Sequence, residues 1–203
     1  MGKTFFDYVT DGGNYPLFGL PATEELAGRT ARLPDGTEVR FGEELAVKCD
    51  DDLFLAQREG RLLLVEELPD ESLRALDAEK ETAAAEALPP ALEGWETDFS
   101  FASGYVLTAA FGNGALALRP SPEPEAVNIC ASGEAPAGPT APEAPAPALA
   151  SLPLRAAETG EKRFLLRFPE TGETVFLNAR RFLLFSLREG RIAAGFVEVP
   201  PRE

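Results

Sequence analysis

The stretch Leu-Phe-Leu-Ala-Gln-Arg-Glu-Gly-Arg-Leu-Leu-Leu-Val, residues 53–65, predicts an apolar β-hairpin that turns at Arg58-Glu59-Gly60-Arg61. Apolar side chains stand at alternate and at intervening positions of both arms. Because successive side chains of a strand point to opposite faces, both faces of this hairpin are apolar. We therefore expect a second layer, or a second chain, to cover each face.

Much of this pattern occurs again near the end of the chain. Residues 182–194 contain the same Arg-Glu-Gly-Arg turn between two apolar arms. Further upstream, the Leu-Pro-Asp-Gly-Thr segment within residues 32–41 aligns with residues 167–177, with Thr171 as one inserted residue. Recurrence of turns and apolar arms in the same order favours an internal duplication. The alternative is that short hairpins rich in Leu, Arg and Glu converge on similar sequences.

These patterns predict a mainly β fold. We expect duplicated antiparallel hairpin or meander units to form a sandwich or barrel-like core. The remaining features are one short-to-medium helix at residues 70–88 and a strap rich in proline and alanine. The helix is predicted from Pro69 and acidic residues at its start, an alanine-rich body, and Pro89-Pro90 at its end. Its few large apolar residues favour a solvated face over an acidic docking site.

The composition divides the chain into four parts. Residues 1–28 form an irregular aromatic N-terminal arm in which residues 22–27 could make one helical turn, and residues 29–132 an acidic β-rich domain. Residues 133–160 read as a Pro/Ala-rich linker, and residues 161–203 as the second β repeat, docked on the first.

The central part of the chain contains a further predicted hairpin. Asn113-Gly114 stands between two apolar runs, and this dipeptide strongly favours a two-residue β-turn. Trp95, Phe99 and Phe101 precede the hairpin and are interpreted as core residues. A platform for stacking nucleic-acid bases is the alternative, but no basic residues surround these aromatics.

The charge of the protein is acidic and unevenly distributed. The net charge is −15 over 203 residues. Residues 1–100 carry 9 Lys and Arg against 23 Asp and Glu, or −14, whereas residues 161–203 carry 8 against 6, or +2. This balance argues against direct binding to nucleic acid or to an anionic membrane, since both need clustered cations.

The absence of histidine removes several classes of chemistry. Without histidine the chain cannot build a Ser-His-Asp or Cys-His catalytic centre or a histidine zinc site. No glycine-rich loop lies between a strand and a helix to hold a nucleotide. We therefore expect no enzyme activity, no cofactor and no metal, while a hydrolase based on paired carboxylates remains a weaker alternative.

The candidate local sites are one run of carboxylates and two cysteines. The run at residues 50–52 consists of three aspartates and could contribute to a calcium or magnesium site, but it lacks the alternate spacing of an EF-hand loop. We favour a solvated loop between strands. Cys49 follows an alternating apolar pattern and is expected to be a buried, unreactive thiol, although a disulfide with Cys130 remains open.

The apolar run at the N-terminus is too short for a signal peptide and is interrupted too early. No apolar run in the sequence is long enough to span a membrane. The expected location is therefore cytoplasmic, with a virion as an alternative.

Together these features favour a noncatalytic β-rich interaction or structural protein, acting through protein–protein contacts or self-association in a bacterial or phage assembly. The alternative is an acidic inhibitor or nucleic-acid mimic that covers a basic surface. Candidate interface residues are the aromatics of the arm and the arginines of the second repeat: Phe5, Phe6, Tyr8, Arg180, Arg181, Arg188 and Arg191.

Overall fold

The computed structural model describes residues 20–85, 87–100, 106–120, 150–179, 183–188 and 191–199. Within these ranges the protein is mainly β, with two short helices. The candidate interface residues of the arm and Arg180 and Arg181 lie outside the described residues, as does Cys130. Of Arg188 and Arg191, only the backbone is described.

The first half of the chain builds a seven-stranded sheet in the order β1-β4-β5-β6-β7-β2-β3. Neighbouring strands are antiparallel except β2 and β7, which are parallel. The elements of this half are β1 (Leu20–Pro21), α2 (Thr23–Leu26), β2 (Thr30–Arg32), β3 (Glu38–Arg40), β4 (Ala46–Asp50), β5 (Leu53–Arg58), β6 (Arg61–Glu67), β7 (Leu73–Asp77) and α3 (Ala78–Ala83).

The remaining strands build a nine-stranded antiparallel sheet in the order β11-β10-β9-β8-β16-β15-β14-β13-β12. Among the described strands no ladder joins the edge strands β11 and β12, so the sheet is not a closed barrel. Its strands are β8 (Glu96–Ser100), β9 (Val106–Gly112), β10 (Ala115–Pro120), β11 (Ala150–Pro153), β12 (Arg155–Gly160), β13 (Arg163–Phe168), β14 (Glu173–Asn178), β15 (Leu183–Arg188) and β16 (Arg191–Val199).

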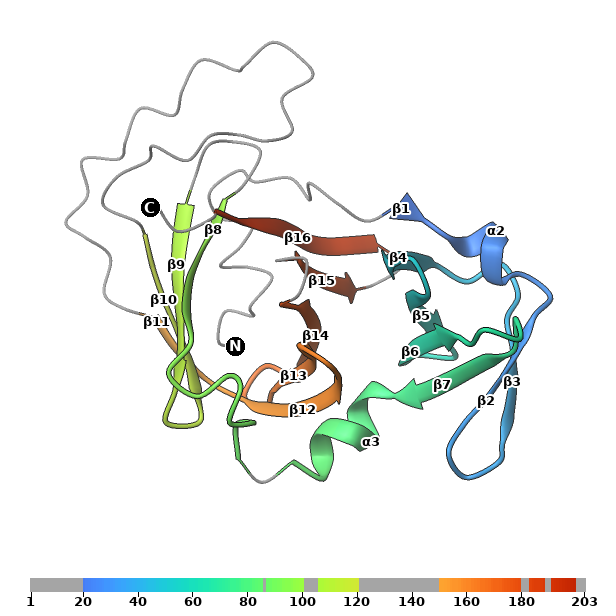
Figure 1. Ribbon diagram of the computed structural model, residues 1–203, viewed down its shortest axis with the longest axis horizontal. Helices are drawn as coiled ribbons and strands as arrows, with labels where there is room; N and C mark the ends of the chain where they lie inside the picture. Colours follow the sequence, from blue (N-terminus) through green and yellow to red (C-terminus); the bar gives the residue numbers. More distant parts are fainter. Residues whose placement is uncertain are drawn as a thin grey trace, which may run out of the picture.

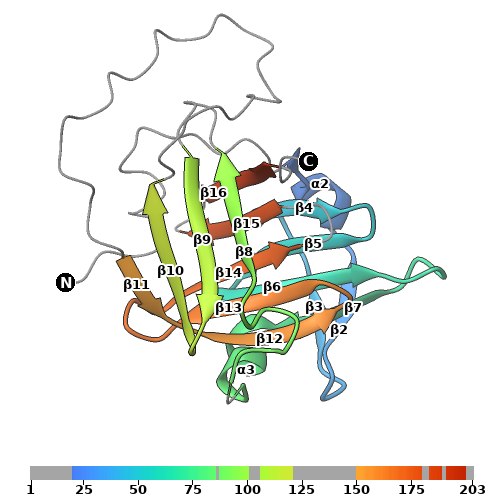
Figure 2. The same ribbon diagram turned by 60° about the vertical axis from the view of Figure 1, so that its left-hand side comes forward.

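The two sheets form stacked layers. The nine-stranded sheet bends, so that β8–β11 lie opposite β12–β15, and the seven-stranded sheet packs on the other side of β13–β15 (Figure 1). Strands β8–β10 cross the strands behind them steeply (Figure 2). Three apolar cores result: one inside the bent sheet, one between the two sheets, and one beneath α2 and the β2–β3 hairpin.

The hairpin β5–β6 is covered on both faces by layers of its own chain. Phe54 and Val65 belong to the core beneath α2, whereas Leu55 and Leu64 belong to the core between the sheets. All four side chains are at least 96% buried. The apolar residues on both faces therefore have partners within the chain and need no second chain to cover them.

The turns expected from the sequence form with backbone angles that suit them. Glu59 and Gly60 have φ values of 52° and 75°, and Asn113 and Gly114 have 52° and 70°. Two successive residues with positive φ make the turn whose twist matches that of a hairpin. The helical turn expected at residues 22–27 is also present, as α2.

The helix predicted over residues 70–88 is wrong over most of that range. Residues 73–77 form β7, which pairs with β6 and with β2, and α3 covers only Ala78–Ala83. Leu73 and Ala75 point into the core in alternation with Arg74. Leu, Arg and Ala favour a helix, but pairing with strands on both sides outweighs this local propensity. The helix starts only where the Asp77 carboxylate accepts hydrogen bonds from two backbone amides.

Two other expectations about the chain's organisation need correction. Residues 150–160, expected within the linker, form β11 and β12. Strands β8–β10, assigned to the acidic domain, belong to the same sheet as the strands after residue 161. Pairing between β8 and β16 joins the two parts of this sheet. The two strands lie far apart in the sequence, and no local sequence pattern predicts that they pair.

The repeated sequences form matching hairpins in different surroundings. The first copy contains β2–β3 and β5–β6, and the second contains β13–β14 and β15–β16. In the second copy, β14 pairs directly with β15, whereas in the first copy β3 is an edge strand and β7 separates β2 from β6. The duplication itself stays a prediction.

Candidate functional site

The face of β13 that packs against the seven-stranded sheet carries Arg163, Leu165 and Arg167. Across the ladder these residues pair with Asn178, Phe176 and Thr174 of β14 in that order. Leu165 and Phe176 lie in the core between the sheets and are fully buried. Each end of this apolar core therefore has an arginine beside a polar residue of β14.

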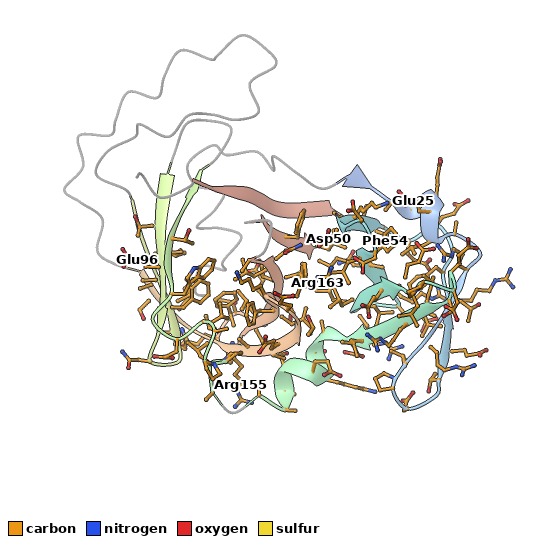
Figure 3. The ribbon with its side chains drawn as sticks, viewed as in Figure 1. Glu25, Asp50, Phe54, Glu96, Arg155 and Arg163 are labelled. Carbon is orange, nitrogen blue, oxygen red and sulfur yellow. The ribbon has the colours of Figure 1, made fainter. Side chains whose placement is uncertain are left out.

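Arg163 joins the two halves of the chain at one end of the core. Its Nη2 group lies 3.0 Å from Asp50 Oδ2 and 3.0 Å from Asp52 Oδ1. The side chains of Arg163 and Asp50 are only 15% and 5% exposed. Figure 3 shows the two residues between the layers. Such a buried pair holds the layers in register, because separating its members would leave a charge without compensation.

Asn178 completes this network. Its Nδ2 group donates to Cys49 O at 3.3 Å and to Asp50 Oδ2 at 3.1 Å, and its side chain is fully buried. Asp50 Oδ1 also accepts the backbone amide of Asp51 at 2.9 Å. Partial burial by itself lowers the pKa of Arg163, but hydrogen bonds and charges from Asp50 and Asp52 outweigh burial and raise that pKa.

The run of aspartates was expected to be a solvated loop, and this is wrong for its first residue. Asp50 is the last residue of β4 and is buried against Arg163, while Asp51 and Asp52 form the turn to β5. Its partner lies 113 positions away in the sequence, so no local pattern could indicate the pair. Within the described residues no group of three or more Cys, Asp or Glu could hold a metal ion.

Cys49 is a buried thiol, as expected. It lies on the inner face of β4 in the core between the sheets and is 2% exposed. Burial raises the pKa of the Cys49 thiol well above its usual range, and the charge of Asp50 adds to this effect. The thiol is free of any disulfide.

At the opposite end of the core the two sheets leave a cavity of about 300 Å³. Arg167 borders it and is 26% exposed. The Arg167 Nη1 group donates to Thr174 Oγ1 at 3.1 Å, and Nη2 lies 3.0 Å from Glu79 Oε1. Further lining residues come from the β5–β6 hairpin, from β14 and from β15: Gln57, Leu62, Glu173 and Leu187.

No sequence pattern indicates this cavity, although most of its walls come from the repeated segments. Gln57 and Leu62 flank the Arg-Glu-Gly-Arg turn of the first copy, and Thr174 follows the turn at residues 169–172 of the second copy. The alternation within Arg163–Phe168 does predict that Arg163 and Arg167 share a strand face. It does not predict that a second sheet lies opposite that face.

A second hollow of about 590 Å³ lies at the β2–β3 edge of the seven-stranded sheet. It is bounded by the β2–β3 turn and by the loop before β7. Arg32 and Arg74 line it, and each forms an ion pair with a neighbouring acid, Glu38 and Glu66 respectively. All four are solvent-accessible, and such exposed pairs contribute little free energy.

The exposed charges of the first half are predominantly acidic. Between residues 20 and 85, ten acidic side chains are exposed against four basic ones, Arg32, Arg40, Arg74 and Lys80. The ten acids are Glu24, Glu25, Asp35, Glu38, Glu43, Asp51, Glu59, Asp70, Glu71 and Glu79. They lie on α2, on α3, on edge strand β3 and in the turns between strands.

Comparisons with known proteins found no relative: no family model, no curated protein and no solved structure matches the chain. No helix among the described residues has the length and hydropathy needed to cross a membrane.

Proposed function

We propose that this protein acts without catalysis, as a β-rich interaction or structural protein whose work is done by contacts with other proteins. A subunit of a bacterial or phage assembly is the context that this proposal favours. The observation that carries it is the acidic excess exposed on the helices, edge strand and turns of the first half.

The stacked layers support this proposal because they make a rigid support for that surface. The core between the sheets is tied at one end by Arg163, Asp50 and Asn178, so the described layers hold their relative positions. Polar groups buried in this network stabilise the protein's own layers. The exposed acidic side chains are accessible to a binding partner, and their charge favours a partner surface rich in Lys and Arg.

Light scattering coupled to size-exclusion chromatography tests the self-assembly form of the proposal. We expect the molar mass of the full chain to rise with protein concentration, and the rise to change with salt because exposed charges are screened. A monomer whose mass is independent of both concentration and salt would contradict self-assembly.

A second candidate function, an acidic protein that covers a basic surface, rests on the same ten exposed acids. It is distinguished by competition: a nucleic-acid mimic must displace DNA or RNA from the partner it binds. We expect a charge-neutralised variant, Glu24→Gln with Glu43→Gln, to bind such a partner more weakly than the wild-type chain. A partner that binds nucleic acid and this protein together would rule out mimicry.

A further inference from the structure

The described sheets end in the edge strands β1, β3, β11 and β12. An open strand edge can pair with another strand, unless a proline or a bulge interrupts it. β1 and β11 both end in proline, at Pro21 and Pro153, and the ladder of β12 shifts register between Glu158 and Gly160. β3, at the outer edge of the seven-stranded sheet, has neither feature (Figure 1). It is therefore the described edge most open to a further strand.

The backbone of β3 has hydrogen-bonding groups on this open side. Toward β2, the Leu33 amide donates to Thr37 O at 2.8 Å, and the Phe41 amide donates at 2.9 Å to the residue that precedes β2. Along a strand of an antiparallel sheet, the N–H and C=O groups of successive residues point alternately to the two sides. The backbone groups of Glu38 and Arg40 therefore point away from β2, toward the open edge.

The side chains at this edge carry opposite charges at the positions that a second strand would contact. Glu38 and Arg40 are exposed on one face of β3, on either side of Val39, which is buried on the other face. Glu38 forms an ion pair with Arg32 at 3.3 Å that is largely exposed, and none of the described ion pairs uses Arg40. Such an exposed pair contributes little free energy, so Glu38 can also interact with a second cation.

We propose that β3 pairs with β3 of a second copy of this chain, antiparallel and about a two-fold axis at Val39. In this register Glu38 lies opposite Arg40 of the partner subunit, and Arg40 lies opposite Glu38 of the partner subunit. Both cross-strand pairs then have opposite charges on one face. The same register joins the backbone groups that point toward the open edge, so the sheets of the two copies become continuous.

This inference rests on the self-association form of the proposed function, for which it names the surface and the partner. The contact involves a short strand, and small interfaces are typical of weak, reversible association. Each copy carries a net charge of −15, so the two copies repel each other at long range. At about 0.15 M salt this repulsion is screened beyond about 8 Å, which leaves the contacts at the edge to decide whether the copies associate.

Sedimentation equilibrium of the full chain at this salt concentration tests the stoichiometry. The molar mass should rise with concentration and level off at twice that of the monomer, because a two-fold contact uses the β3 edge of both copies. A chain that stays monomeric at every concentration would contradict both this inference and the self-association form of the proposed function. A mass that continues to rise beyond the dimer would contradict only the closed contact at β3.

Charge reversal tests the register. In Glu38→Arg both cross-strand pairs contain two cations, and in Arg40→Glu both contain two acids, so each variant alone should dimerise at least about tenfold more weakly than wild type. A mixture of these two variants has opposite charges at both pairs and should dimerise about as tightly as wild type. Glu24→Arg makes the same change of charge on α2 and should not weaken dimerisation.

Circular dichroism should show that these variants keep the wild-type fold, because the replaced side chains are exposed. Equal dissociation constants for Glu38→Arg and Glu24→Arg, or no gain when the two edge variants are mixed, would overturn pairing at β3. In that case self-association of the wild-type chain would still support the proposed function, and another surface would carry it.

Discussion

Arg163 and Arg167 lie on the same face of β13, on either side of Leu165, and mark the two ends of the apolar core between the sheets. Arg163 is 15% exposed and is held by two aspartates from the first half of the chain. Arg167 is 26% exposed and borders a cavity. The same residue type at matching positions therefore links the two layers at one end of the core and lines a cavity at the other.

Replacing Arg163 should destabilise the protein strongly. In Arg163→Met the carboxylate of Asp50 stays buried without its cation, and we expect the free energy of unfolding in urea to fall by about 3 kcal/mol. Asp52→Asn is the matched control, because Asp52 is 46% exposed and should cost less than about 1 kcal/mol. An equal decrease in the free energy of unfolding for the two variants would show that the burial of Asp50 does not determine the loss of stability.

The buried thiol of Cys49 should make stability fall at alkaline pH. An exposed cysteine thiol has a pKa of about 8.5, whereas burial raises the pKa of Cys49 in the folded state. Above that pH the unfolded chain releases a proton that the folded chain keeps. The free energy of unfolding should therefore decrease, by up to about 1.4 kcal/mol per pH unit.

The measurement for Cys49 is urea unfolding of wild type and Cys49→Ala at several pH values. The alanine variant loses some packing at every pH, but the difference between the two proteins should narrow as the pH rises. A difference that is constant across the alkaline range would contradict a raised pKa for this thiol.

Packing between the sheets predicts the effect of truncating Phe176. This side chain is fully buried between the sheets, so Phe176→Ala should cost about 3 to 5 kcal/mol. Leu62→Ala, at the partly buried margin of the same core, should cost clearly less. Both variants should unfold in one transition when followed by fluorescence and by circular dichroism. Separate transitions for the two probes would mean that the sheets unfold independently.

The turn of the β5–β6 hairpin predicts an effect that comes from the backbone alone. Gly60 has a φ of 75°, and a Cβ atom added there would meet nothing within 4 Å. Gly60→Ala should therefore destabilise by about 1 kcal/mol because of backbone strain rather than a clash. Glu59→Asn should stabilise slightly, since asparagine tolerates the φ of 52° better. Thermal unfolding measures both, and a neutral Gly60→Ala would contradict the turn geometry.

The sequence by itself determined the local β structure. Continuous apolar runs on both sides of an Arg-Glu-Gly-Arg turn predicted the arms of the β5–β6 hairpin, and Asn113-Gly114 predicted the turn of another hairpin. These features depend on neighbours in the chain, through the period of a strand and the φ preferences of turn residues. The same local reasoning failed at residues 73–77, where two adjacent strands offer pairing that no property of the segment itself indicates.

Only the tertiary structure decided which strands share a sheet, and with that the site. Asp50 and Arg163 are separated by 113 positions, and Gln57 meets Arg167 at one cavity only because two sheets stack there. Contacts of this kind depend on which apolar faces pack together in the folded chain. An apolar face can pack against many different surfaces, because the hydrophobic effect is not directional. The sequence shows which residue types are present, but it does not show which of them come into contact.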